Sequence, residues 1–125
     1  SGRSHFRLRL DRVQDDGCAL FHVDTLPLRM LCTYAGPGTQ WLEEDNARRD
    51  QLGSSGRSLT EANQAIVIRE SEIRLVPAWH VLVFKGRLYE GYGHSQGLVH
   101  RSAPVRHSRD FRIRLTLDFS DSCAC

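Results

Sequence analysis

Two short stretches of the sequence carry side chains that could bind a metal ion. The segment FHVD (21–24) places an imidazole and a carboxylate two residues apart, and His100 lies in the apolar segment LVHRSAPV (98–105). On a strand, residues i and i+2 project from the same face, roughly 6–7 Å apart. His22 and Asp24 can therefore converge on one ion, and a histidine from a distant strand would complete a three-point site.

Two histidines and one carboxylate form a ligand set with open coordination positions, as in non-haem Fe(II) oxygenases. The plainer alternative makes His22 a buried core histidine and Asp24 a cap on the following turn. Because an H-x-D pair followed by a later histidine is common by chance, the surrounding elements have to decide between the two interpretations.

The elements expected around these residues are almost all strands. Segment 6–13 alternates apolar and basic residues, which predicts a half-buried strand with its arginines facing water. No βαβ rhythm and no internal repeat is visible, so an all-β sandwich or barrel in a single domain, residues 1–125, is expected. The further predicted strands are 18–24, 28–34, 39–42, 64–70, 72–77, 80–86, 98–105 and 111–119.

The segment 43–63 differs from the rest of the chain because it is polar and contains GSSG. We expect a short helix around 45–52 followed by a mobile loop. A glycine-rich loop is predicted at 91–97 and a flexible tail at 120–125. Cys123 and Cys125 of this tail could bind a soft metal, but a frayed terminus is the default expectation.

The composition restricts the partners and the compartment. Seventeen basic and fifteen acidic residues give a net charge of +2, which makes nucleic-acid binding unlikely. No apolar run is long enough to span a membrane, and no secretory leader is visible, although one could have been removed. The four cysteines show no disulfide-scaffold spacing, so we expect a reduced, cytoplasmic protein.

The strand 111–119, FRIRLTLDF, separates its apolar and polar residues onto two faces. Its polar face, with Arg112 and Arg114, either lies in water or lines a cavity. If it lines a cavity, an arginine could bind a carboxylate there, because the planar guanidinium forms two parallel hydrogen bonds.

The order of these motifs resembles the Fe(II)- and 2-oxoglutarate-dependent dioxygenase superfamily. The chain has H-x-D, a long gap, a histidine and an arginine twelve residues later. LVHRSAPVRHSRDFRIRLTLDF resembles the final strands of that superfamily, and RLVPAWHVLVFKG and TYAGPGTQWL resemble two of its intervening segments. With FHVDTLPLRMLCTYAGPGTQWL, the chain most resembles an uncharacterised bacterial family within or near the superfamily. The resemblance covers residues 18 to 119.

This resemblance implies a double-stranded β-helix, the jelly-roll architecture of cupins. His22, Asp24 and His100 would hold Fe(II), and Arg112 would bind the distal carboxylate of the cosubstrate 2-oxoglutarate. The implied activity is that of a hydroxylase-type oxygenase on an unidentified small-molecule or protein substrate. Arg114 departs from the family pattern because a serine often stands there, and the anionic ligand could therefore differ. Candidates for the pocket wall are Thr33, Tyr34, Thr39 and Trp41.

Two other functions stay open. The first is a cupin-like metal-binding protein without oxygenase turnover, which does not need an arginine aimed into its cavity. The second is a β-sandwich interaction module, in which His22, Asp24 and His100 do not converge. The direction of Arg112 and the distances among the three candidate ligands distinguish these functions. The sequence names neither the substrate nor the oligomeric state.

Overall fold

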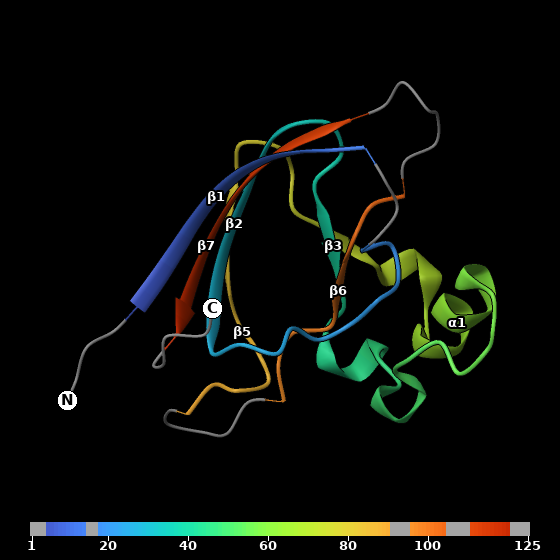
Figure 1. Cartoon of the computed structure of the whole chain (residues 1–125). Helices are drawn as coiled ribbons and strands as arrows, with labels where there is room; N and C mark the ends of the chain where they lie inside the picture. Colours follow the sequence, from blue (N-terminus) through green and yellow to red (C-terminus); the bar gives the residue numbers. More distant parts are fainter. Residues whose placement is uncertain (1–4, 15–17, 91–95, 105–110, 121–125) are drawn as a thin grey trace.

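The computed structural model describes residues 5–14, 18–90, 96–104 and 111–120. Within this part of the chain, most of the regular structure is β, in two antiparallel sheets accompanied by a single α-helix. Figure 1 shows the smaller sheet between the larger sheet and the helical segment. The all-β class predicted from the sequence is therefore confirmed. No helix in the described part is long and apolar enough to cross a membrane.

The larger sheet has four strands in the order β1-β7-β2-β5. Each neighbouring pair is antiparallel, and β7 lies centrally, paired along its length with β1 and β2. β1 and β7 are long runs that alternate apolar and polar residues, whereas β2 and β5 are shorter, mainly apolar runs, and the predicted positions of all four agree closely with those observed. The bounds are His5–Val13 for β1, Leu28–Ala35 for β2, Val81–Lys85 for β5 and Arg112–Ser120 for β7.

The smaller sheet has three short strands in the order β4-β3-β6. The predicted strands 72–77 and 98–105 are shorter than expected, and 18–24 is not a strand. That segment makes an isolated β-bridge, between His22 and His100, and the N–H of Ser102 in β6 donates to the Cys18 carbonyl at 2.9 Å, but these contacts do not form a continuous ladder. The bounds are Thr39–Trp41 for β3, Arg74–Leu75 for β4 and His100–Ser102 for β6.

The segment between β3 and β4 contains the helices. The strand predicted at 64–70 is wrong, because α1 spans Leu59–Ile66. Ser58 and Glu61 form a reciprocal capping box at its start, and Ala62 and Ile66, one turn apart, are buried. The helix predicted around 45–52 is instead two 3-10 helices, Glu44–Asn46 and Arg49–Gln51. A third 3-10 helix spans Glu70–Glu72.

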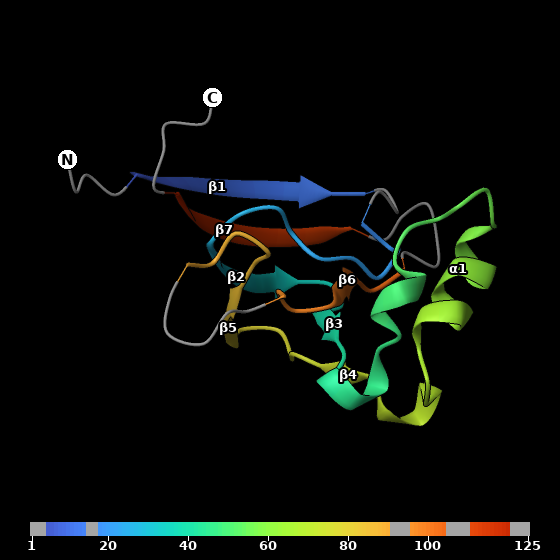
Figure 2. The same cartoon turned by 90° about the horizontal axis from the view of Figure 1, so that it is seen from below.

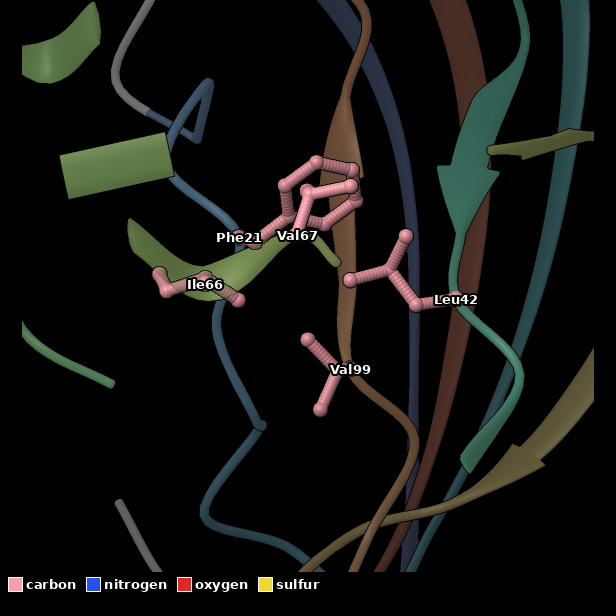
Figure 3. Packing of buried hydrophobic residues seen from close by; sticks show 5 residues of the cluster. All are labelled: Phe21, Leu42, Ile66, Val67 and Val99. Carbon is pink, nitrogen blue, oxygen red and sulfur yellow. The ribbon is translucent and has the colours of Figure 1, made fainter. Parts of the chain in front are cut away.

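The apolar core lies between the smaller sheet and the helical segment, as Figure 3 shows. A buried cluster there joins five side chains from four separate stretches of the chain, and Phe21 and Ile66 in it are fully buried. Burying each such side chain stabilises the fold by about 1.5–3 kcal/mol. The members of the cluster are Phe21, Leu42, Ile66, Val67 and Val99.

The larger sheet turns its polar face toward the smaller sheet and its apolar face outward. Arg112 and Thr116 of β7 are only 3% and 1% exposed, whereas Phe6, Leu8 and Leu10 of β1 are all more than 60% exposed. The prediction that 6–13 buries its apolar face is therefore wrong, although Arg7 and Arg12 are exposed as predicted and Arg9 is partly buried. The alternation of apolar and polar residues shows only that the two faces of a strand differ. Which face is buried depends on the element that packs against the sheet.

The two sheets can be followed from a second direction in Figure 2, where β1 and β7 lie along one side and α1 at the far end. Three predicted features fall wholly or partly outside the described residues. They are the flexible tail at 120–125, of which Ser120 belongs to β7, the glycine-rich loop at 91–97, and the end of the strand predicted at 98–105.

Candidate metal centre

His22 and His100 are held side by side by the backbone. The N–H of His22 donates to the carbonyl oxygen of His100 at 2.9 Å, and the N–H of His100 donates back to His22 at 3.0 Å. The ring centroids lie 4.6 Å apart. Because both hydrogen bonds of this bridge belong to the backbones of the two histidines themselves, the bridge holds the points from which both rings project close together.

Asn63 of α1 anchors the segment that carries His22. Its side-chain oxygen accepts from the Phe21 N–H at 2.9 Å, and its side-chain nitrogen donates to the carbonyl of Ala19 at 3.1 Å. Both bonds are buried, so they replace the pairing that a regular strand would supply at these positions. Sequence reasoning missed this residue because it assigned position 63 to a loop.

Asp24 completes the cluster. Its Oδ1 lies 3.2 Å from Nε2 of His22, and its Oδ2 lies 3.3 Å from Nε2 of His100. One ligand atom from each of the three residues can be chosen so that all lie within 4.8 Å of one another. The structure therefore brings together the three residues that the sequence singled out, which excludes the arrangement in which they do not converge.

The outer ring nitrogens set the state of both histidines. Nδ1 of His22 lies 2.7 Å from the carbonyl oxygen of Leu20, and Nδ1 of His100 lies 2.9 Å from that of Leu98. A carbonyl only accepts, so each Nδ1 carries the proton and donates. In the neutral rings both Nε2 lone pairs then face the Asp24 carboxylate, a repulsive arrangement that a cation relieves. Metal-binding histidines have this kind of backbone support.

The titration of the cluster reflects the same attraction for positive charge. Burial lowers the pKa of His22, but hydrogen bonds to Asp24 and to the Leu20 carbonyl outweigh it and raise that pKa above its ordinary value. Burial raises the pKa of Asp24, whereas hydrogen bonds from His100 and His22 lower it much further. Asp24 is therefore ionised throughout the physiological range.

A second polar group, Arg29, also contacts Asp24. Nη1 of Arg29 donates to Asp24 Oδ2 at 2.7 Å, while its Nε and Nη2 donate to the two oxygens of Asp118 at 2.5 and 2.9 Å. Asp118 lies opposite Arg29 on β7, and Arg9 of β1 lies 3.6 Å from the same carboxylate. Sequence reasoning did not find Arg29, since its role depends on strand pairing across 89 residues.

The predicted anion-binding arginines lie on the inward face of β7. Nη1 of Arg112 donates to the carbonyl of Ala103 at 2.5 Å, and Nη1 of Arg114 lies 3.5 Å from Oγ of Ser102. Ser102 follows His100 by two residues on β6 and shares its face. Within the described residues, Nε of Arg114 and Oγ1 of Thr116 are buried without a hydrogen-bond partner. The space between the sheets therefore offers donors that suit a polar, anionic ligand.

The four residues predicted for the pocket wall are not all in one place. Thr39 and Trp41 lie opposite Ser102 and His100 in the smaller sheet, so they share the face of the cluster. Thr33 is buried and pairs with Arg114 on the inward face of the larger sheet. The structure places Tyr34 elsewhere, with its ring edge-on to the exposed Trp79 at 4.7 Å.

A cavity of about 950 Å³ opens beside the cluster, between β5 and the smaller sheet. Its lining includes Trp41, Phe84 and Val99, and the ring centroids of Phe84 and His100 lie 4.5 Å apart. The three candidate ligands are not part of the lining. The cavity therefore adjoins the cluster without containing it.

The chain belongs to the family described as protein of unknown function (DUF1826), whose model matches residues 1–118. No curated protein sequence and no solved structure shows significant similarity to the chain.

Proposed function

We propose that this protein is an Fe(II)- and 2-oxoglutarate-dependent oxygenase of the hydroxylase type. The observation that carries this function is the convergence of two Nδ1-supported imidazoles and one carboxylate, with arginines on the facing strand. Two histidines and one carboxylate suit non-haem Fe(II) and leave coordination positions open for other ligands. Fe(II), when bound with 2-oxoglutarate, supplies the oxidative chemistry, and the protein supplies position, charge and exclusion of water.

The strand order supports the finer assignment to a double-stranded β-helix. The described residues contain seven strands, and the segment bridged at His22 makes an eighth extended piece beside β6. Along the chain, most successive pieces alternate between the larger and the smaller sheet, and only β3 and β4 are successive neighbours in one sheet. Eight pieces in two facing sheets are the pattern of a jelly roll.

Each group of residues in the site has a separate role in the proposed reaction. His22, Asp24 and His100 would hold the metal, and in the neutral rings the Leu20 and Leu98 carbonyls accept from Nδ1, which leaves both Nε2 lone pairs available as ligands. A carboxylate of 2-oxoglutarate would lie against β7. Arg112 already donates to the Ala103 carbonyl. The guanidinium of Arg114, whose Nε is buried without a hydrogen-bond partner among the described residues, is therefore the better candidate to bind that carboxylate.

The second candidate, a cupin-like metal-binding protein without oxygenase turnover, is favoured by one observation. Arg112, the arginine that the family resemblance assigns to the cosubstrate, is engaged with a backbone carbonyl. If Arg114 does not replace it, the site would hold a metal but no 2-oxoglutarate.

An anaerobic titration separates the two candidates. Fe(II) and then 2-oxoglutarate are added to the protein, and the weak visible charge-transfer band of the Fe(II)–2-oxoglutarate chelate is followed. We expect this band in the wild type. Arg114→Met should raise the Kd for 2-oxoglutarate about 10–100-fold, because a charge-assisted hydrogen bond contributes about 1.5–3 kcal/mol. Arg74→Met, at an exposed arginine paired with Glu43, serves as the matched control.

The readout that follows is succinate formation in air. A protein that binds Fe(II) but gives neither the band nor succinate would contradict the oxygenase and favour the metal-binding protein.

A further inference from the structure

Arg29 makes the two oxygens of Asp24 unequal. Its Nη1 donates to Oδ2 at 2.7 Å, and the Arg29 side chain is only 19% exposed. Within the described residues, Oδ1 faces only Nε2 of His22, at 3.2 Å. A charge-assisted hydrogen bond of this length occupies a lone pair of Oδ2 and lowers the capacity of that oxygen to bind a metal. Oδ1 is therefore the better ligand atom.

The position of Arg29 is itself fixed by Asp118. The guanidinium is bound through two parallel hydrogen bonds to the Asp118 carboxylate, and the remaining nitrogen reaches Asp24. Arg29 and Asp118 are directly paired on neighbouring strands, so the fork is held by the sheet as well as by its ion pairs. A lysine could not replace it, because an ammonium lacks the planar geometry that serves both carboxylates at once.

The number of Asp24 oxygens that bind a metal decides how much of its coordination sphere stays open. An octahedral ion with two imidazoles and one carboxylate oxygen keeps three positions free, whereas a carboxylate that binds through both oxygens leaves two. The proposed oxygenase needs three, two for 2-oxoglutarate and one for O₂.

We propose that Arg29 is a positioning residue that keeps Asp24 a one-oxygen ligand and so preserves the third open position. This inference rests on the proposed function for its purpose, but its geometry concerns the metal alone. Without Arg29, Oδ2 would turn to the metal. Binding would become tighter, because a positive charge is removed and a ligand atom is gained, while the number of metal-bound waters would fall.

The test uses Mn(II) as the only ligand and compares wild type with Arg29→Met. Water proton relaxation reports the number of exchanging waters on Mn(II), and the same titration gives its Kd. We expect the relaxation enhancement per bound Mn(II) to fall by about one third and the Kd to fall about tenfold. Arg29→Gln should have the same effect, because the shorter glutamine amide cannot reach both Asp24 and Asp118. This variant keeps a polar group at position 29 and serves as the test if Arg29→Met does not fold. Arg74→Met is again the matched control.

The outcomes separate this inference from the proposed function. If either Arg29 variant folds and keeps the wild-type relaxation, or binds Mn(II) more weakly, Arg29 only supports the structure and the inference is overturned. If the number of Mn(II)-bound waters falls in the Arg29 variants as expected, but Fe(II)-loaded wild type does not bind 2-oxoglutarate, the inference about Arg29 stands and the proposed oxygenase function is contradicted. A wild type that binds no Mn(II) overturns both.

Discussion

Replacing Asn63 with alanine should destabilise the protein and loosen the metal site together. The substitution removes two buried hydrogen bonds and leaves the Phe21 N–H and the Ala19 carbonyl without a protein partner. Each unsatisfied buried group costs about 1–3 kcal/mol, so the loss of two partners should lower the free energy of unfolding by about 2–6 kcal/mol. The segment 19–22 would then be held mainly by the bridge between His22 and His100.

Urea unfolding of the chelator-treated protein measures this effect. With a denaturant dependence of about 2 kcal/mol per molar urea, the midpoint should fall by roughly 1–3 M. Gln64→Ala is the matched control, because Gln64 is exposed on the same helix and should change the free energy of unfolding by less than about 0.5 kcal/mol. If Asn63→Ala and Gln64→Ala unfold at the same urea concentration and bind Mn(II) equally, Asn63 does not anchor this segment.

Three further predictions concern the core, a close backbone approach and pH. Phe21→Ala, at a fully buried ring, should lower the free energy of unfolding by about 3–5 kcal/mol in the same assay, and a loss below 1 kcal/mol would contradict its place in the core. Gly86→Ala should lower the melting temperature, because a Cβ there would lie 2.0 Å from the Leu26 carbonyl oxygen; an unchanged value would refute this approach. The raised pKa of His22 stabilises the metal-free fold below pH 6.5, and this contribution disappears as pH rises through the raised value. The lowered pKa of Asp24 stabilises the fold above pH 3.8, and that contribution declines as pH falls below it. In urea midpoints measured against pH, His22→Asn should therefore remove the His22 slope above pH 6.5 and also weaken the acid slope, because His22 is one of the groups that lower the pKa of Asp24. A profile like that of the wild type would contradict this coupling.

The sequence predicted β1 and β7 because a long run that alternates apolar and polar residues is typical of a strand, and it predicted β2 and β5 from apolar runs bounded by turn residues. β1 and β7 were found almost to the residue, but which of their faces lies inside was not, since β1 alone cannot reveal what stands opposite Arg9 and Phe6. The helix α1 was missed although its capping box, Ser58 with Glu61, is visible in the sequence. The apolar run after it was taken for a strand, and short apolar runs do not distinguish the two.

The candidate ligands could be predicted because H-x-D spacing is local and His100 followed from the order of motifs. Arg29 and Asn63 could not, because each acts through partners that are distant in sequence. Arg29 depends on Asp118, 89 residues away, and Asn63 on a backbone stretch more than 40 residues earlier. Such partners follow only from strand register and helix packing, which a single sequence does not specify.

The measurement that tests the central claim most directly is anaerobic equilibrium dialysis of Fe(II) against the chelator-treated protein. Wild type is compared with His22→Ala and His100→Ala, and His80→Ala is the control because His80 is exposed and stands outside the cluster. A metal centre at His22, Asp24 and His100 predicts about one Fe(II) per chain in the wild type and the control, and a loss in both cluster variants that stay folded. Equal Fe(II) in all four proteins, or none in a folded wild type, would contradict it.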